Sequence, residues 1–143
     1  MEANELMIGD WFRRRSIYQD TGREVVTDFQ ITQICKNGES LYVYGPKGNL
    51  GRVDQIEPIP LTPEILEKNG FTDCETTKLD REMGNTFWYP GKDNFISDST
   101  LMINLMKDSF LIRFGTNTIY RLRFVNELQH ALLLFGIEKT IEL

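Results

Sequence analysis

The segment IEPIPLTPEILEKNGF, residues 56–71, decides how this chain is divided. Proline fixes its own φ and restrains the residue before it, so Pro58 and Pro60 predict a stiff, extended connector. A chain of 143 residues is long enough for one ordinary domain, or for two small parts that share a core. We therefore expect a boundary at this segment, between residues 1–60 and residues 61–143.

The same segment encodes a short helix directly after the connector. Thr62 is a suitable N-cap, and Pro63 is suited to the first helical position. Gly70 can adopt the left-handed conformation that ends many helices. Phe71 would then fold back onto Leu66, which is the apolar contact of a Schellman motif. The sequence therefore predicts a helix that begins after Thr62 and ends at Gly70.

The N-terminal part has the pattern of short strands separated by tight turns. In one long β-rich segment, the apolar residues move from one face of the strand to the other between Ile31 and Ile34. This shift predicts a bulge or a strong bend. Asn37-Gly38 is a tight-turn signal, and apolar residues spaced by three predict a 3₁₀ turn at 53–55. Short curved strands with a late 3₁₀ turn favour an SH3-like small β-barrel, with an OB-like barrel as the alternative.

The C-terminal part combines an antiparallel meander with two helices. Alternating apolar residues predict a hairpin over 101–106 and 110–114. A second helix is expected over 125–135, because apolar residues recur there at spacings of three and four, and it ends at Gly136. Residues 141–143 suggest a last short strand. The order helix, meander, helix, strand predicts a β-rich α+β fold.

The charge balance limits the classes of partner. Sixteen basic and 21 acidic residues give a net charge of −5, and phosphate neutralisation needs a surplus of Lys and Arg. Nucleic acid is therefore a disfavoured partner, and an anionic membrane surface is not expected. Residues 1–5 carry acids where a signal peptide needs basic residues, and the longest apolar run, 131–137, is too short to span a bilayer. We expect a cytoplasmic protein.

No recognisable catalytic or metal-binding motif is present. Cys35 and Cys74 stand 39 positions apart, without a CxxC, and are expected to be reduced, buried small hydrophobes. The single histidine, His130, falls off the apolar face of the second predicted helix. Nucleophile elbow, P-loop, dinucleotide fingerprint and calcium loop are all missing. We therefore expect no catalytic residue, no cofactor and no metal, although a carboxylate pair could still assemble in space.

The run Arg13-Arg14-Arg15 is the one concentration of positive charge. On a strand the three side chains alternate between faces, so at most two of them point to solvent together. One interpretation is a solvated barrel rim. The other is a phosphate-contacting patch, because arginine makes bidentate contacts with phosphate.

Aromatic side chains are the remaining candidates for a binding surface. If Leu41 and Val43 face the interior, Tyr42 and Tyr44 share the outer face, where paired aromatics can stack bases or hold an extended peptide. The alternative is that the C-terminal part covers them. Trp88 raises the same choice between core packing and an exposed interface anchor.

Three stretches of the chain carry a resemblance that spans its whole length: NELMIGDW at 4–11, IEPIPLTPEILEKNGF at 56–71 and VNELQ at 125–129. On these stretches the chain resembles a family of short proteins of gut bacteria, often found within prophages and other mobile elements. The family usually has Val-His-Glu-Leu-Gln at the third stretch, and Asn126 replaces that histidine here. Any role of the histidine therefore does not carry over. The resemblance implies a two-part β-rich fold and a mobile-element context, and it implies no activity.

These observations leave three functional hypotheses. The first is a non-enzymatic interaction module that binds another protein, or itself, through an aromatic face or an open sheet edge. The second is a nucleic-acid-binding accessory protein that uses the arginine run with the tyrosines, and the third is an enzyme of unrecognised type. The candidate partner-binding residues are Tyr42, Tyr44, Trp88, Arg13, Arg14 and Arg15.

Overall fold

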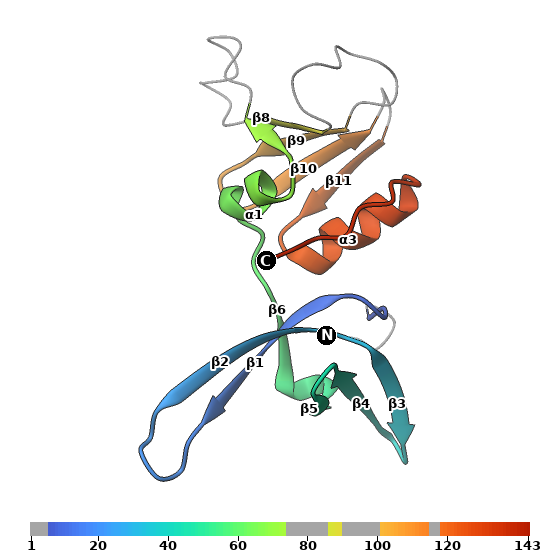
Figure 1. Cartoon of the computed structure of the whole chain (residues 1–143). Helices are drawn as coiled ribbons and strands as arrows, with labels where there is room; N and C mark the ends of the chain where they lie inside the picture. Colours follow the sequence, from blue (N-terminus) through green and yellow to red (C-terminus); the bar gives the residue numbers. More distant parts are fainter. Residues whose placement is uncertain (1–5, 74–85, 90–100, 115–117) are drawn as a thin grey trace. The chain divides into compact units, whose positions relative to one another are not determined.

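The computed structural model describes four segments of the chain: residues 6–73, 86–89, 101–114 and 118–143. The chain separates into two compact units, which we call unit 1 (Met1–Ile59) and unit 2 (Pro60–Leu143). The described segments contain three antiparallel sheets and two α-helices (Figure 1). This confirms the predicted β-rich α+β class.

Unit 1 is built from two three-stranded antiparallel sheets. In the first sheet β1 is central, between β2 and β6, and in the second β4 is central, between β3 and β5. The strands are β1 (Trp11–Ile17), β2 (Glu24–Gln30), β3 (Gln33–Asn37), β4 (Ser40–Gly45), β5 (Gly48–Arg52) and β6 (Ile56–Pro58). Among the described residues the two sheets do not close into a barrel, so the SH3-like barrel stays a prediction.

The chain passes from the first sheet to the second directly after β2. Ile31 N donates to the carbonyl of Asp10, the residue before β1, at 2.9 Å, whereas Thr32 N donates to the carbonyl of Tyr44 on β4 at 2.8 Å. The amide of Ile31 thus continues the pairing alongside β1, whereas the amide of the next residue, Thr32, bonds to the second sheet. The bend predicted between Ile31 and Ile34 lies at this passage.

Two further local predictions for unit 1 are confirmed. The turn at Asn37-Gly38 joins β3 to β4, and Gly38 has a φ of 64°, which favours glycine. The predicted 3₁₀ turn is the 3₁₀ helix η2 (Val53–Gln55), and it leads directly into β6. Both features follow from local chain chemistry.

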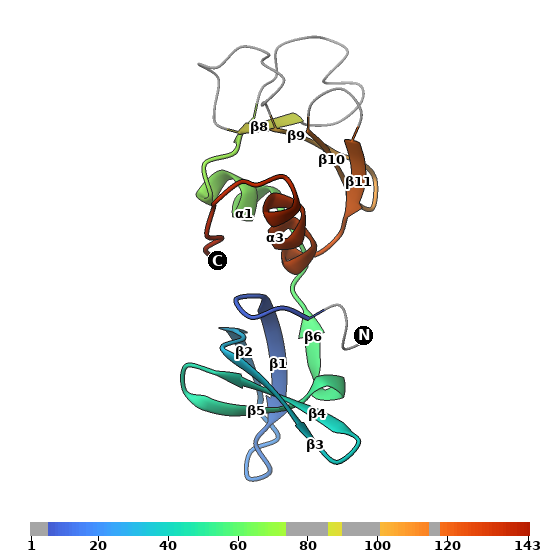
Figure 2. The same ribbon diagram turned by 90° about the vertical axis from the view of Figure 1, so that its right-hand side faces the viewer.

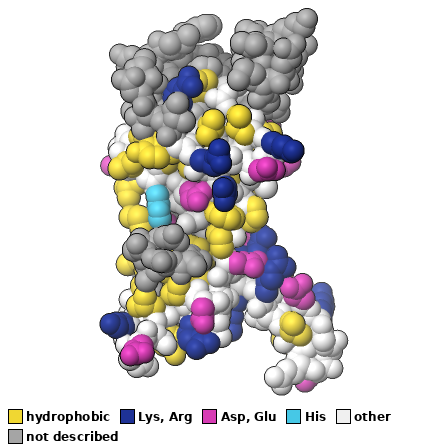
Figure 3. Space-filling view, turned by 180° about the vertical axis from the view of Figure 1, so that it is seen from behind, with side chains coloured by type: hydrophobic (Ala, Val, Ile, Leu, Met, Phe, Trp, Pro, Cys, Tyr) yellow, Lys and Arg dark blue, Asp and Glu magenta, His cyan; other side chains and the backbone are white. Residues whose placement is uncertain are grey.

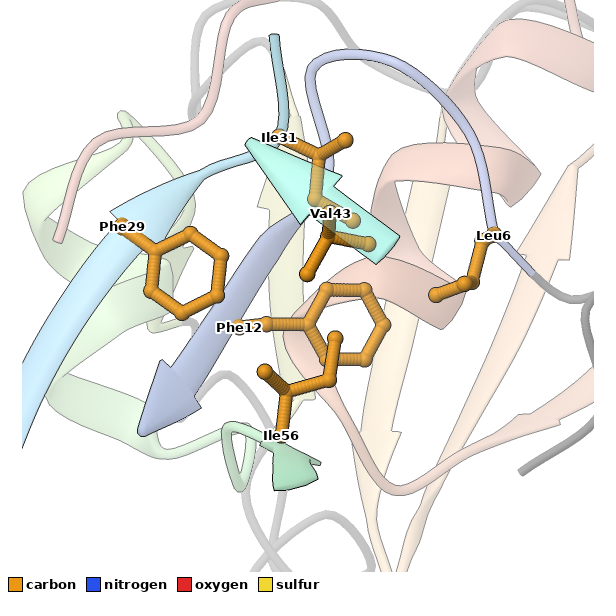
Figure 4. Packing of buried hydrophobic residues seen from close by; sticks show 6 residues of the cluster. All are labelled: Leu6, Phe12, Phe29, Ile31, Val43 and Ile56. Carbon is orange, nitrogen blue, oxygen red and sulfur yellow. The ribbon is translucent and has the colours of Figure 1, made fainter. Parts of the chain in front are cut away.

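One apolar cluster forms the core of unit 1. Its side chains come from both sheets and point toward one another (Figure 4). Phe12 and Val43, at the middle of the cluster, are fully buried. The buried members are Leu6, Phe12, Phe29, Ile31, Val43 and Ile56, and the half-buried Ile34, Leu50 and Val53 pack against them.

Unit 2 is a five-stranded antiparallel sheet in the order β11-β10-β9-β8-β7, and Figure 2 shows both helices on the same side of it. The predicted hairpin is confirmed by β9 and β10, whose inward residues Leu101, Ile103 and Ile112 are fully buried. The elements are α1 (Pro63–Lys68), β7 (Thr72–Asp73), β8 (Thr86–Tyr89), β9 (Leu101–Leu105), β10 (Phe110–Phe114), β11 (Thr118–Leu122) and α3 (Val125–Leu134).

Helix α1 has the start and the end that the sequence predicts. Thr62 Oγ1 accepts a hydrogen bond from Ile65 N at 3.3 Å, and Pro63 is the first helical residue. Gly70 has a φ of 85°, and Phe71 N donates to the carbonyl of Leu66 at 3.0 Å. The Thr62 cap thus begins the helix, and the Schellman bond ends it after six residues.

Helix α3 ends with the same motif, and its glycine provides a clean test of backbone strain. Gly136 has a φ of 73°, and a Cβ atom added there would contact nothing within 4 Å. We expect Gly136→Ala to lower the free energy of unfolding by about 1 to 2 kcal/mol, because only the left-handed conformation is penalised.

The measurement is urea denaturation of Gly136→Ala beside Glu138→Ala, a replacement of an exposed side chain two residues later. The control should stay within about 0.5 kcal/mol of the parent chain. Equal losses in the two variants would contradict the assignment of a strained cap.

The prediction of a strand at 141–143 is wrong. A side chain holds this segment instead. Asn69, the C-cap residue of α1, donates from Nδ2 to the carbonyl of Glu142 at 2.7 Å and accepts at Oδ1 from Glu142 N at 2.8 Å. The carboxamide therefore bonds the backbone of Glu142 as a neighbouring strand would, and Ile141 is buried beside it.

Candidate functional site

The arginine run lies on β1, the central strand of its sheet. Successive side chains of a strand alternate between its faces. Phe12 belongs to the buried core, so Arg14 shares the core side of the sheet, and Arg13 and Arg15 share the outer side. The three arginines are therefore divided between the two faces of the sheet, as their consecutive positions on a strand predict.

Both outward arginines are held by carboxylates. Arg13 donates from Nε and Nη2 to the two carboxylate oxygens of Asp28, at 2.7 and 3.1 Å. Arg15 donates from Nε to Glu57 at 2.6 Å and from Nη1 to Glu24 at 3.3 Å. The hydrogen bond with Asp28 raises the pKa of Arg13, and the hydrogen bonds with Glu57 and then Glu24 raise the pKa of Arg15.

On the outer face of this sheet, carboxylates lie on both sides of the two arginines. The two guanidinium groups lie on the central strand, and three carboxylates flank them on β2 and β6. Figure 3 shows positive and negative side chains beside one another on the β1–β2 hairpin, at its lower right. The cluster has a net charge of −1, and carboxylates already occupy the fork-shaped donors that would bind phosphate. Arg14, half-buried, makes no ion pair with any described residue.

Strand β2 is an edge strand, and its outward backbone groups can be identified. Opposite residues of an antiparallel pair alternate between exchanging two backbone hydrogen bonds and exchanging none. Tyr18 N donates to the carbonyl of Arg23 at 2.9 Å, so this pair is bonded, and by the register Val25 and Thr27 also bond to β1. The residues between them, whose N–H and C=O groups point to the open side, are Glu24, Val26 and Asp28.

We call this stretch, Glu24–Asp28, the β2 edge. Exposed apolar side chains surround it at the loop end of the β1–β2 hairpin, which reaches beyond the other strands of unit 1 in Figure 1. Ile17 is 70% exposed, Tyr18 60% and Val26 45%. An exposed strand edge with apolar side chains is a site at which proteins pair with another chain, or else a liability that they must protect.

Tyr42 and Tyr44 share the outer face of the second sheet. Val43 between them is fully buried, whereas both tyrosines are half-buried. Tyr42 lies opposite Cys35 on β3 and opposite Arg52 on β5. The tyrosines and the arginine run therefore belong to different sheets of unit 1.

Cys35 differs from its prediction. It is half-buried instead of buried, because its strand is an edge strand and its side chain shares the outer face with Tyr42. Its sulfur is a free thiol and accepts a hydrogen bond from Gln33 Nε2 at 3.0 Å. Cys74 lies outside the described residues.

The other candidates contribute less to a site. The backbone of Trp88 pairs with Thr72 and Met102 in β8, but its side chain lies outside what the structure describes. His130 is half-buried on α3. Within the described segments, no group of three His, Cys, Asp or Glu side chains is placed to hold a metal ion. The same segments contain no helix that is long and apolar enough to cross a membrane.

The β2 edge is the feature that reasoning from sequence missed. The sequence predicts an open sheet edge as one kind of binding surface, but the location of that edge at β2 depends on the partners of β1. The sequence contains one signal of how this strand pairs. If the segment that carries Arg13 and Arg15 pairs with it in antiparallel fashion, the acidic residues at positions 24 and 28 come close to the two arginines. No protein-family model, curated protein sequence or solved structure matches this chain.

Proposed function

We propose that this chain is a non-enzymatic protein-interaction module that binds its partner along the β2 edge. One observation carries the proposal: exposed backbone groups of Glu24, Val26 and Asp28 lie next to the exposed side chains of Ile17 and Val26. Backbone hydrogen bonds give affinity when a strand is added to a sheet, and nearby apolar side chains add buried area.

The charge arrangement favours protein over nucleic acid as the partner. A phosphate site needs guanidinium groups with free donors and a local surplus of positive charge. On this face Arg13 and Arg15 are outnumbered by three carboxylates that bind them. The alternative that combines the arginine run with Tyr42 and Tyr44 lacks support, because these residues lie on different sheets.

We also propose that unit 1 is an SH3-like module. The order β2-β1-β6 in one sheet and β3-β4-β5 in the other, with the 3₁₀ helix η2 before β6, supports this assignment. Such small β modules commonly bind extended segments of other proteins.

The test is site-specific photo-crosslinking in cells that express the chain. A photoreactive residue replaces Ile17 at the hairpin end, or Ile8 as the matched control, since both side chains are 70% exposed. We expect a discrete adduct with one other protein from position 17 and none from position 8.

A parallel anisotropy titration with single- and double-stranded oligonucleotides in dilute salt should detect no binding, because electrostatic affinity is largest there. Binding of either oligonucleotide, or no adduct specific to position 17, would overturn the proposal.

A further inference from the structure

We infer that the β2 edge binds an extended segment in which basic residues flank an apolar residue at alternate positions. The inference rests on the proposed function and adds the chemistry of the partner. It follows from three properties of the edge: the spacing of its outward backbone groups, the side chains that share their face, and the sign of their charge.

The spacing comes from the pairing of β1 with β2. An added antiparallel strand would exchange backbone hydrogen bonds with Glu24, Val26 and Asp28, which have outward N–H and C=O groups. Residues directly opposite one another share a face of the sheet. The residues of the added strand at i, i+2 and i+4 would therefore lie against these three side chains.

The charge of that face favours a basic partner. Glu24 and Asp28 lie on β2, at the open side, whereas Arg13 and Arg15 lie one strand further in. An added strand therefore meets the carboxylates first. The side chain of Glu24 is 53% exposed, so it can accept another hydrogen bond while it contacts Arg15. Lysines at i and i+4 complement the two acids, and an apolar residue at i+2 covers Val26.

The same charges disfavour a second copy of this chain as the occupant. An antiparallel pairing of two β2 strands centred on Val26 uses all three outward residues of each copy. In that register, Glu24 of one copy lies directly opposite Asp28 of the other, twice. Like charges directly opposite each other destabilise a sheet. On the core-side face, β2 itself presents Val25 and Thr27, which are uncharged and suit β-branched neighbours.

The probe is a synthetic peptide with the core Lys-Thr-Val-Thr-Lys, titrated into the ¹⁵N-labelled full chain, beside a Glu-Thr-Val-Thr-Glu peptide. Before addition, the amides of Glu24, Val26 and Asp28 should exchange with solvent faster than those of Val25 and Thr27. The lysine peptide should slow the exchange of the outward amides and bind about tenfold more tightly than the glutamate peptide in dilute salt.

Two variants separate backbone pairing from charge. Val26→Pro removes an outward N–H that β1 does not use, and should abolish peptide binding, whereas Val26→Thr keeps that N–H and should retain it. Glu24→Lys should reduce the preference for the lysine peptide at least threefold. This charge variant keeps the test decisive if Val26→Pro does not fold.

The outcomes distinguish this inference from the proposed function. A crosslink from position 17 without preference for the lysine peptide leaves the interaction module in place and overturns the partner chemistry. Equal binding of both peptides, binding that Val26→Pro leaves intact, or concentration-dependent self-association through β2 would also overturn it. Lysine-peptide binding that Val26→Pro abolishes and Glu24→Lys weakens supports both.

Discussion

Replacing Phe12 with alanine should lower the free energy of unfolding by about 3 to 5 kcal/mol. Phe12 is fully buried and lies on the central strand of the first sheet of unit 1. In Figure 4 its ring lies among side chains contributed by both sheets, Val43 of β4 and Ile56 of β6 included. Truncation removes apolar burial and leaves a cavity that two different sheets would have to move to fill.

The measurement is urea denaturation followed through NMR signals of β1 and β4, so that the result refers to unit 1. Ile8→Ala is the matched control, because this large aliphatic side chain of the same unit is 70% exposed and its loss should change stability by less than about 0.5 kcal/mol. A loss below about 1.5 kcal/mol for Phe12→Ala would show that the cluster does not hold the two sheets together.

The second large effect is expected in unit 2, at Asn69. Asn69→Ala should lower the free energy of unfolding by about 2 to 5 kcal/mol, because it removes three side-chain hydrogen bonds and leaves the backbone N–H and C=O of Glu142 without this partner. The lost contacts are Nδ2 to the carbonyl of Glu142 at 2.7 Å, Oδ1 from Glu142 N at 2.8 Å and Nδ2 to the carbonyl of Ile65 at 2.7 Å. The cost is large for a polar residue because Asn69 itself is only 2% exposed.

Glu67→Ala is the control for this variant, since Glu67 is an exposed residue of the same helix and alanine favours helices. Hydrogen exchange of the Ile141 and Glu142 amides gives a local readout beside the urea midpoint. In Asn69→Ala these amides should lose protection before the rest of unit 2. Unchanged protection there would mean that burial of Ile141, and not the carboxamide, holds the segment.

Local chain chemistry explains what the sequence could predict of the fold. The cap at Thr62, the stop at Gly70 and the turn at Gly38 each depend on a few neighbouring residues and are present in the structure. The alternation of apolar residues over 101–106 also predicts a strand with one buried side, and Leu101 and Ile103 are fully buried there. These features are readable because their energetics involve only adjacent turns of the chain.

Contacts between distant residues explain what could not be predicted. Arg13 and Asp28 are 15 residues apart, and Arg15 and Glu57 are 42 apart, so their pairing depends on strand order and register. The sequence therefore leaves open whether the arginine run is a solvated rim or a phosphate-contacting patch, and it does not show that carboxylates bind two of the three arginines. For the same reason the open edge at Glu24–Asp28 could not be located before the partners of β1 were known.

The carboxamide of Asn69 also has a consequence for synthesis on the ribosome. Its partner Glu142 follows it by 73 residues. At about 5 to 20 residues per second, roughly 4 to 15 seconds of translation separate the two, and the exit tunnel delays their meeting further. Of the backbone partners that the carboxamide has in the folded chain, only Ile65 is present throughout that interval. Unit 2 therefore cannot complete its hydrogen bonding until Glu142 has left the exit tunnel, so the segment around Glu142 is fixed later than helix α1.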